Sequence, residues 1–375
     1  MSTQVDALIV GAGPTGLTLG LCLLKQGKSV LIAEKHLAGL DFSRAILINS
    51  DTLLALAPYG VSQHLRAAGV AVDGFTMHVN NRPISQVHFK VDELDLSHPV
   101  CLPQLKTEAI LTDCFLNAGG QIIRGYEFSA QQAHETNGAW HSTLPAYHGD
   151  ADDVAVQSQW LLGCDGFHSA VRTKLGIEFP GSSLAARPYA VDLELSHWPF
   201  ETNVNVYMDQ DGGCLAVQIG HNHLRLVTAT AAQRDAFMQS LPIKQVTWDS
   251  TFDVHFHVAQ RYGQDRAWLA GDAAHVHSPV GGRGMNMGIL DAVTLAGAVE
   301  SGDLNGYAYQ RHQAAKQWVD FNQRISTIAL EASASSRRTR KLLTSVLPLV
   351  GKVLGPRLAS TAFSRLSSSR LERAD

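Results

Sequence analysis

The sequence lacks the paired cysteines that a disulfide framework or a structural zinc site requires. Its five cysteines are odd in number and scattered, and none of them forms a C-x-x-C pair. A small secreted disulfide scaffold and a zinc ribbon are therefore excluded. This cysteine usage is typical of a reducing compartment, so we predict a cytoplasmic location.

The chain also lacks an excess of positive charge and a long apolar run. Its formal net charge is −4 over 375 residues, so a general basic surface is missing and we predict no nucleic-acid partner. We expect no transmembrane segment, because no apolar run is long enough, and no secretory signal, because a strand pattern begins at Val5. The 45% hydrophobic content predicts a large core and two domains.

A complete set of metal ligands is missing as well. Each of three His-x-His pairs would share one face of a strand, but no carboxylate or cysteine stands at a recognisable spacing, and there is no H-E-x-x-H motif. We therefore predict no metal site and expect these histidines to be hydrogen-bonded or exposed. The pairs are His221/His223, His255/His257 and His275/His277.

A glycine-rich motif is present in the context that a dinucleotide site needs. Residues 5–10 predict a buried strand, Gly11-Ala-Gly-Pro-Thr-Gly16 opens a helix, and a second strand ends at Glu34. Between two strands, a G-x-G-x-x-G motif indicates dinucleotide binding. Gly11 permits the tight turn, Gly13 lets the backbone approach a pyrophosphate, and Gly16 lets helix and strand pack closely.

The residues around this motif indicate how a dinucleotide would be held. Pro14 suits the first helical turn, where its missing N–H is not needed. Glu34 is placed to accept hydrogen bonds from a ribose 2′-OH, and its charge would repel a 2′-phosphate. Arg44 follows this unit and is either a phosphate ligand or an ordinary surface arginine. The pattern does not identify the dinucleotide.

Two later segments also combine a buried strand, an acidic turn and a helix start. In the first, Asp165 and Gly166 form the turn, where the carboxylate can bond backbone N–H groups; a purely structural role is the alternative. In the second, Gly271 and Asp272 precede a glycine-dense loop over 281–286 and a helix. The N-terminus of such a helix offers free N–H groups and a positive dipole end to an anionic ligand.

The patterns divide the chain into two interleaved domains and a tail. Residues 1–72, 100–176 and 262–330 predict a Rossmann-like nucleotide-binding domain, and residues 73–99 and 177–261 predict an inserted, mostly antiparallel sheet domain, in which 250–258 form one strand. Residues 331–375 carry nine basic and three acidic residues with an apolar stripe, which predicts an amphipathic helical segment. Such a stripe packs more often on its own protein than on a membrane surface, which is the alternative.

Taken together, the three motifs resemble those of the FAD-dependent aromatic hydroxylases with the para-hydroxybenzoate hydroxylase fold, the single-component flavoprotein monooxygenases. The likeness covers most of residues 1–325. It implies an α/β fold with a Rossmann-like FAD-binding domain, an inserted antiparallel substrate domain and a C-terminal helical tail. It also implies FAD, noncovalent because no Cys or His stands in a known attachment context, together with NAD(P)H, O₂ and a small aromatic substrate. A homodimer is compatible with it.

The resemblance assigns FAD contacts to positions in all three motifs. Thr15 would face the pyrophosphate, Asp272 would bond the ribityl chain, and the Met285 and Asn286 amides would face the N1–C2=O edge of the flavin. Physical reasoning agrees with the last role, because a reduced flavin is anionic and needs preorganised donors. The implied cofactor-binding residues are Gly11, Gly13, Pro14, Thr15, Gly16, Glu34, Lys35, Arg44, Gln104, Asp165, Asp272, Pro279, Gly282, Gly284, Met285 and Asn286.

The sequence departs from the family pattern at two places that bear on the substrate. Arg283 stands where the family usually has an uncharged residue, and it either adds positive charge beside the flavin or points to solvent. Val217 and Ile219 lie in the strand that carries a carboxylate-binding arginine in the hydroxybenzoate enzymes. This apolar strand predicts a substrate without a carboxylate, such as a lipophilic phenol or a fused-ring polyketide. Arg225, on the next strand, is the nearest charge that could reach the flavin or the nicotinamide.

The implied reaction is hydroxylation through a flavin C4a-hydroperoxide, after NAD(P)H has reduced the flavin. The sequence shows no obligatory acid or base, so we name no catalytic side chain. Epoxidation, Baeyer–Villiger oxidation and antibiotic inactivation are alternatives, as is an FAD-binding protein without redox chemistry. A flavin-dependent halogenase is excluded, because no two tryptophans stand two residues apart as its Trp-x-Trp-x-Ile-Pro segment requires.

Overall fold

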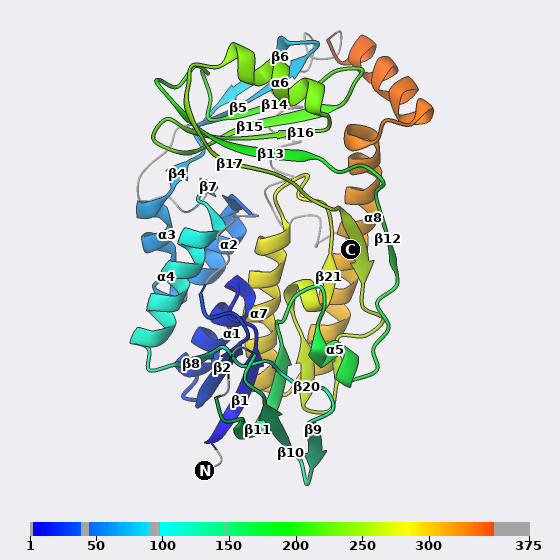
Figure 1. Cartoon of the computed structure of the whole chain (residues 1–375). Coiled ribbons are helices and arrows are strands. Elements are labelled where there is room, and N and C mark those ends of the chain that lie inside the picture. The colour runs from blue at the N-terminus through cyan, green and yellow to red at the C-terminus, as the bar shows by residue number, and fades with distance from the viewer. Residues whose placement is uncertain are drawn as a thin grey trace.

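The computed structural model describes residues 3–38, 45–89, 96, 98–147, 149 and 151–348. Two large sheets organise these residues, one toward each end of the molecule in Figure 1, together with two three-stranded sheets. The predicted fold class, an α/β fold with a parallel core, an antiparallel second sheet and C-terminal helices, is confirmed. No helix within the described ranges combines the length and the apolar character that crossing a membrane would need.

The first large sheet, at the bottom of Figure 1, is parallel in its centre. Strands β8, β2, β1, β11 and β20 run parallel in that order, whereas β19 and the β9–β10 hairpin join antiparallel. The end of β1 is buried at four consecutive residues, as expected for a strand with both faces covered. The strands are β1 (Thr3–Val10), β2 (Val30–Glu34), β8 (Gln121–Arg124), β9 (Ala133–Thr136), β10 (Ala139–Leu144), β11 (Val154–Gly163), β19 (Gly263–Gln264) and β20 (Ala267–Leu269).

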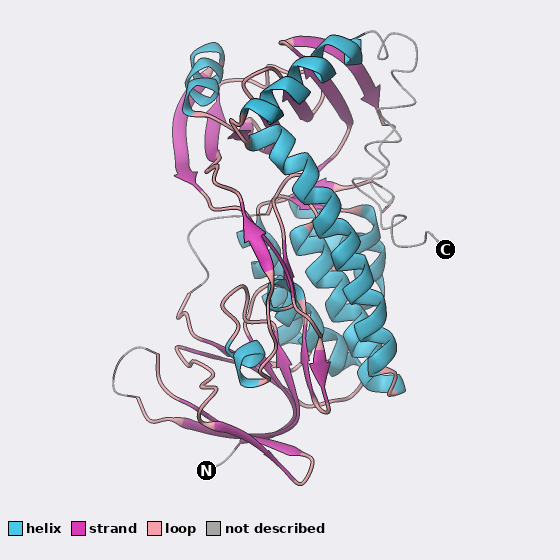
Figure 2. Cartoon of the chain, turned by 90° about the vertical axis from the view of Figure 1, so that its right-hand side faces the viewer, coloured by secondary structure: helices cyan, strands magenta, loops and turns pink. Residues whose placement is uncertain are grey.

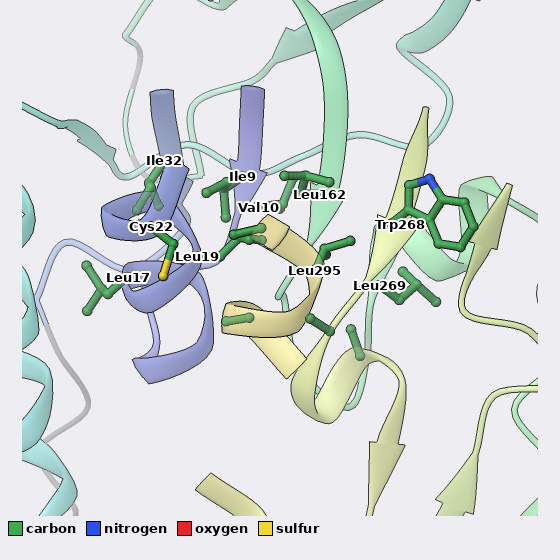
Figure 3. Close-up of a cluster of buried hydrophobic side chains, with 14 of the residues drawn as sticks. Ile9, Val10, Leu17, Leu19, Cys22, Ile32, Leu162, Trp268, Leu269 and Leu295 are labelled. Atoms are coloured by element: carbon green, nitrogen blue, oxygen red, sulfur yellow. The ribbon is translucent and has the colours of Figure 1, made fainter. Parts of the chain in front are cut away.

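Four long helices pack around this sheet: α1 (Pro14–Lys25), α4 (Gln104–Asn117), α7 (Gly284–Ser301) and α8 (Leu304–Leu330). Figure 3 shows Leu19 of α1 and Leu295 of α7 meeting the strand residues Ile9 and Leu162. All four side chains are fully buried, and burial of each contributes about 2 kcal/mol. The contact fixes the start of α1 relative to α7, and both helices begin at the candidate site.

The second large sheet has seven strands in the order β17-β13-β16-β15-β14-β5-β6 and is antiparallel except for the β14–β5 pair. Helix α6 (Ala231–Ser240) packs on one face through Phe237 and Met238. Segments 74–88 and 189–251, far apart in the sequence, thus share one sheet. The strands are β5 (Gly74–Val79), β6 (Arg82–His88), β13 (Tyr189–Leu195), β14 (Val204–Met208), β15 (Gly213–Gly220), β16 (His223–Thr228) and β17 (Ile243–Thr251).

Shorter elements connect the two halves. One small sheet joins β3 (Leu47–Ile48), β7 (Val100–Cys101) and β4 (Val70–Ala71), and the other joins β12 (Gly181–Ser183), β18 (His255–Val258) and β21 (His275–Val276). The short helices are α2 (Ser50–Leu56), η1 (Ala57–Tyr59), α3 (Ser62–Ala68), α5 (Ala170–Lys174) and η2 (Gly271–Ala273).

One expectation about the inserted domain was wrong, and one helix was missed. Residues 250–258 do not form one strand, because β17 ends at Thr251 in the large sheet and β18 begins at His255 in a different sheet. Helix α6 was not predicted at all. It has no fully buried residue, so its hydrophobic pattern was too weak to be recognised.

The tail begins with a helical stretch over 334–348, which continues from the end of α8 (Figure 2). Arg340 is buried and donates to the backbone oxygens of Gln210, Ile328 and Glu331. This part of the tail is therefore attached to the end of α8 and to the hairpin between β14 and β15. Leu342 and Val346 remain 65% and 43% exposed. The rest of the predicted segment lies outside the described residues.

Candidate functional site

The glycines of the first motif have different surroundings. A methyl group at Gly16 would lie 2.0 Å from the Gly11 carbonyl oxygen, and one at Gly11 would lie 2.4 Å from the Cys164 carbonyl oxygen. Gly11 also has a φ of +102°, which favours glycine. A methyl group at Gly13 would meet nothing within 4 Å. Gly11 and Gly16 therefore allow close packing, whereas Gly13 borders open space.

The start of α1 lies beside the Glu34 carboxylate. Gly13 is the N-cap and no side-chain oxygen caps this helix, so the N–H groups of Thr15 and Gly16 are available to a ligand. The Glu34 carboxylate accepts one hydrogen bond from the Ala12 N–H and one from the His36 N–H, each 2.9 Å long. Each carboxylate oxygen keeps capacity for another donor. The free N–H groups suit a pyrophosphate, and the Glu34 carboxylate beside them suits a ribose hydroxyl.

Thr15 is the point where the first and third motifs meet. A methyl group at Gly271 would lie 2.5 Å from Thr15 Oγ1, and one at Gly288 would lie 2.4 Å from the same atom. Gly271 belongs to the turn before Asp272, and Gly288 lies in the first turns of α7. The missing side chains at these two positions let α1, the acidic turn and α7 approach one another.

The second motif lies against the other two. Asp165 Oδ2 accepts hydrogen bonds from the N–H groups of Ala170 at 2.7 Å and Val171 at 3.1 Å, at the start of α5. Its Oδ1 is buried without a partner among the described residues, and desolvation raises the pKa of this carboxyl. Arg172 Nη1 donates to the Ala273 oxygen at 2.9 Å, which ties the second motif to the turn after Asp272.

The loop before α7 is held by the side chain of Asn286. Its Nδ2 donates to the backbone oxygens of Leu47 and Gly282, and its Oδ1 accepts from the Asn49 N–H, all at 2.8 Å. No side-chain oxygen caps α7, so the N–H groups of Gly284 and Met285 point out of the helix start without an acceptor from a cap. The loop is thus fixed by three hydrogen bonds of one side chain and presents donors, as an anionic ring edge would need.

Three further predicted cofactor residues have described positions. Asp272 is exposed at the turn. Gln104 begins α4, and its Oε1 accepts from the Ala45 N–H at 3.1 Å. Lys35 Nζ lies 5.7 Å from the centre of the Tyr147 ring. Arg44 lies outside the described residues, so its predicted contact with a phosphate remains a prediction.

Arg283 is buried, and this excludes the solvent-pointing alternative. It is 3% exposed, and its guanidinium carbon lies 4.6 Å from the centre of the Trp318 ring on α8. The neighbouring His277 has a buried Nε2 without a partner among the described residues. Burial, with the nearby charges of His275 and Arg283, lowers the pKa of His277 to about 3. His277 is therefore neutral at physiological pH.

A buried charged network supports the third motif and was not predicted from the sequence. Asp291 accepts from the Gly271 N–H at 3.0 Å and from Arg311 Nε at 2.6 Å, and it bonds His275 Nε2 at 2.6 Å. Burial alone raises the pKa of Asp291, but the charges and hydrogen bonds of His275 and Arg311 outweigh it and hold this pKa below its usual value. The carboxylate of Asp291, among apolar neighbours in helix α7, was the signal available in the sequence.

The other histidine pairs also have protein partners. His257 Nδ1 lies 2.8 Å from the Phe179 oxygen, and His223 Nδ1 lies 2.8 Å from the His221 oxygen. His255 bonds the Ser183 hydroxyl. Across the described ranges, no three His, Cys, Asp or Glu side chains gather as metal ligands.

One face of the seven-stranded sheet turns toward the part of the molecule that carries the three motifs, and we call it the inner face. It carries Val204, Val217 and Ile219, which pack in one cluster with Cys101 and Leu47 of the small β3-β7-β4 sheet. Leu47 in turn lies against Gly282, where a methyl group would be 2.9 Å from Leu47 Cδ2. The inner face therefore adjoins the loop before α7.

The inner face is not wholly apolar. Arg225 lies opposite Val217 on one side and opposite Asp192 on the other. Its Nε and Nη2 donate to the two carboxylate oxygens of Asp192. The apolar strand β15 was predicted, but the ion pair on its neighbours was not, because it depends on the register between β13 and β16.

Comparisons with known proteins agree with this arrangement. The model of the family described as FAD binding domain matches residues 4–235 and 222–322. A 12-dehydrotetracycline 5-monooxygenase/anhydrotetracycline 6-monooxygenase of Streptomyces rimosus subsp. rimosus is 28% identical, covering 92% of this chain and 73% of its own. A rifampicin monooxygenase of Streptomyces venezuelae is 29% identical, covering 91% and 75%.

A solved structure extends the likeness to the whole fold. The p-nitrophenol 4-monooxygenase of Pseudomonas putida superimposes with a TM-score of 0.82 at 22% identity, covering 99% of this chain and 100% of its own. At this identity the superposition speaks for the fold alone. The family match spans most of the chain, and the chain therefore belongs to the FAD-binding-domain family, as an FAD-dependent monooxygenase of the aromatic hydroxylase group.

Proposed function

We propose that the protein is an NAD(P)H-consuming monooxygenase that hydroxylates a lipophilic aromatic or polycyclic substrate. The observation that carries the proposal is the packing of the first motif against the other two. Thr15 lies against Gly271 and Gly288, and Gly11 lies against the Cys164 carbonyl, so that two uncapped helix starts and two acidic turns come together. Residues 1–72, 100–176 and 262–330 would form the FAD-binding domain, and residues 73–99 and 177–261 the substrate domain.

The residues present fit FAD. The open space beside Gly13 and the free N–H groups of α1 suit the pyrophosphate, and Glu34 keeps acceptor capacity for the adenosine ribose. Asp272 would bond the ribityl chain, and the start of α7 would face the pyrimidine edge of the ring. We expect FAD to be bound noncovalently in a cytoplasmic protein, because no Cys or His stands in a known attachment context.

When bound, FAD would supply the transfer of electrons from NAD(P)H to O₂. The chain's own part is to orient the ring and to exclude water. Asn286 holds the loop, the donors at the start of α7 favour negative charge on the ring, and the apolar residues of the inner face keep water from the substrate. No side chain needs to act as an acid or base in this arrangement.

A turnover screen tests the proposal directly. We expect the purified, yellow holoenzyme to oxidise NADH or NADPH faster in the presence of a suitable phenol or fused polyketide, with a product heavier by one oxygen in mass spectrometry. Epoxides or ring-expanded lactones would instead indicate the alternative oxygenations. Flavin-containing protein that neither consumes the nucleotide nor makes peroxide with any aromatic compound would overturn the proposal.

We expect Asp272→Ala to purify nearly colourless, because the exposed carboxylate is assigned to the ribityl hydroxyls and its loss removes charge-assisted hydrogen bonds. The affinity for FAD should fall about tenfold or more. The measurement is the flavin-to-protein absorbance ratio, with Asp320→Ala as a matched control at an exposed position on α8. Full flavin content in Asp272→Ala would refute the role of this residue.

A further inference from the structure

The Asp192–Arg225 pair places two opposite charges on the inner face, on the neighbouring strands β13 and β16. The side chains are 16% and 3% exposed, respectively, and the bond from Arg225 Nη2 to Asp192 Oδ2 is 2.6 Å long. The guanidinium carbon also lies 4.9 Å from the centre of the Trp248 ring on β17. Arg225 is thus held in a fixed orientation by a two-point carboxylate contact.

Strand alternation establishes on which face the pair lies. Leu224 and Leu226 flank Arg225 and pack in the cluster that contains Phe237 of α6. Since successive side chains point to opposite faces, Arg225 points away from α6, to the face that also carries its neighbour Val217. Asp192 lies on this face for the same reason, because Val191 and Leu193 belong to the α6 cluster.

The exposures decide what an approaching ligand meets. The carboxylate is the more exposed partner, so a ligand on the inner face meets Asp192 before it meets the guanidinium. The Arg225 guanidinium already donates two hydrogen bonds to the Asp192 carboxylate, in the same geometry that a carboxylate ligand would require. An anionic substrate would have to displace Asp192 or lie beside it, and like charges in a poorly hydrated site repel strongly.

We propose that Asp192 is a specificity-determining residue that, by pairing with Arg225 on the inner face, restricts the site to aromatic substrates without a carboxylate. The inference rests on the proposed function, since it takes the inner face as the substrate wall. It assigns the exclusion to one carboxylate rather than to the general apolar character of β15. Removing that carboxylate, while keeping Arg225, turns the exclusion into recognition.

The test compares benzoate with methyl benzoate, a pair that differs by the charge. Binding to the oxidised holoenzyme is followed by calorimetry or by the change in flavin absorbance. We expect the wild type to bind the ester about tenfold or more tightly than the acid. In Asp192→Asn, the affinity for benzoate should rise about tenfold, while the affinity for the ester changes by less than about threefold.

Three further variants separate specificity from structure. Asp192→Glu should behave as the wild type. Glu194→Gln should do so too; it removes a different carboxylate of the same strand, which lies 3.4 Å from Lys244 Nζ. Asp192→Asn/Arg225→Gln should show no gain for benzoate, because the gain depends on the guanidinium. If Asp192→Asn does not fold, the wild-type comparison can still refute the inference, since equal affinity for acid and ester would overturn it.

These outcomes are independent of turnover. Unchanged benzoate affinity in folded Asp192→Asn, or an equal gain for the ester, would refute the role of Asp192 and leave the monooxygenase proposal intact. A gain for benzoate in a protein that fails the turnover screen would support the role of Asp192 and count against the proposed reaction alone.

Discussion

Gly16→Ala is expected to destabilise the native fold strongly, whereas Gly13→Ala is expected to fold normally and to bind FAD more weakly. A methyl group at Gly16 would lie 2.0 Å from the Gly11 oxygen and 3.2 Å from its carbon. Both are backbone atoms, so helix α1 would have to move away from β1, at a cost of about 3 kcal/mol or more. At Gly13 the backbone is extended, with φ −75° and ψ 179°, and a methyl group has room.

The two variants are distinguished by unfolding and by flavin content. Urea unfolding of the FAD-free protein should show a large loss of stability for Gly16→Ala and a loss below about 1 kcal/mol for Gly13→Ala. The affinity of Gly13→Ala for FAD should fall about tenfold or more, because its methyl group occupies the space assigned to the pyrophosphate. Gly27→Ala is not a suitable control, since its φ is +79°. A stable Gly16→Ala, or a Gly13→Ala that binds FAD as the wild type does, would contradict the packing.

Asp291→Ala is expected to have the second large effect on stability. It leaves Arg311, which is 2% exposed, charged in the core without its carboxylate, and leaves the Gly271 N–H without its acceptor. Breaking a buried ion pair by removing one partner costs about 3–5 kcal/mol. Because Gly271 precedes Asp272, we also expect the variant to bind FAD more weakly. Asp320→Ala on the exposed side of α8 serves as the control.

The same carboxylate gives the wild type a defined response to acid. The pKa of Asp291 is held below its usual value in the folded state, so its contribution to stability is fully present above about pH 4 and is lost as the pH falls through the folded pKa. His277 acts in the same direction at higher pH. Its folded pKa of about 3 means that only the unfolded chain takes up a proton as the pH falls below about 6.5.

Unfolding free energies measured from neutral to acid pH would test these signs. The wild type should lose stability in both ranges, whereas Asp291→Asn should lack the component below about pH 4. If Asp291→Asn and the wild type unfold with equal free energies at neutral pH, the network does not support the fold as described.

Several features of this protein could be predicted because they depend on local sequence. A turn that needs a positive φ, as at Gly11, and a helix that must pack closely on a strand, as at Gly16, leave glycines at fixed spacing. The strands and helices around them carry continuous or periodic apolar patterns. Helix α6 and the break between β17 and β18 escaped prediction, because neither leaves a strong local pattern.

The amino-acid sequence by itself determined the three strand–turn–helix units that carry the motifs, the fold class and the family. These follow from motifs that each lie within one turn and its flanking elements. Only the tertiary structure decided how charges inside the protein are matched. Arg225 finds Asp192 across a strand register, Asp291 joins His275 and Arg311 from two other elements, and Arg283 stacks on Trp318 of α8. Such partners are distant along the chain, so no local pattern shows them. A buried charge is costly unless it is paired, and only the tertiary structure brings the partner to it.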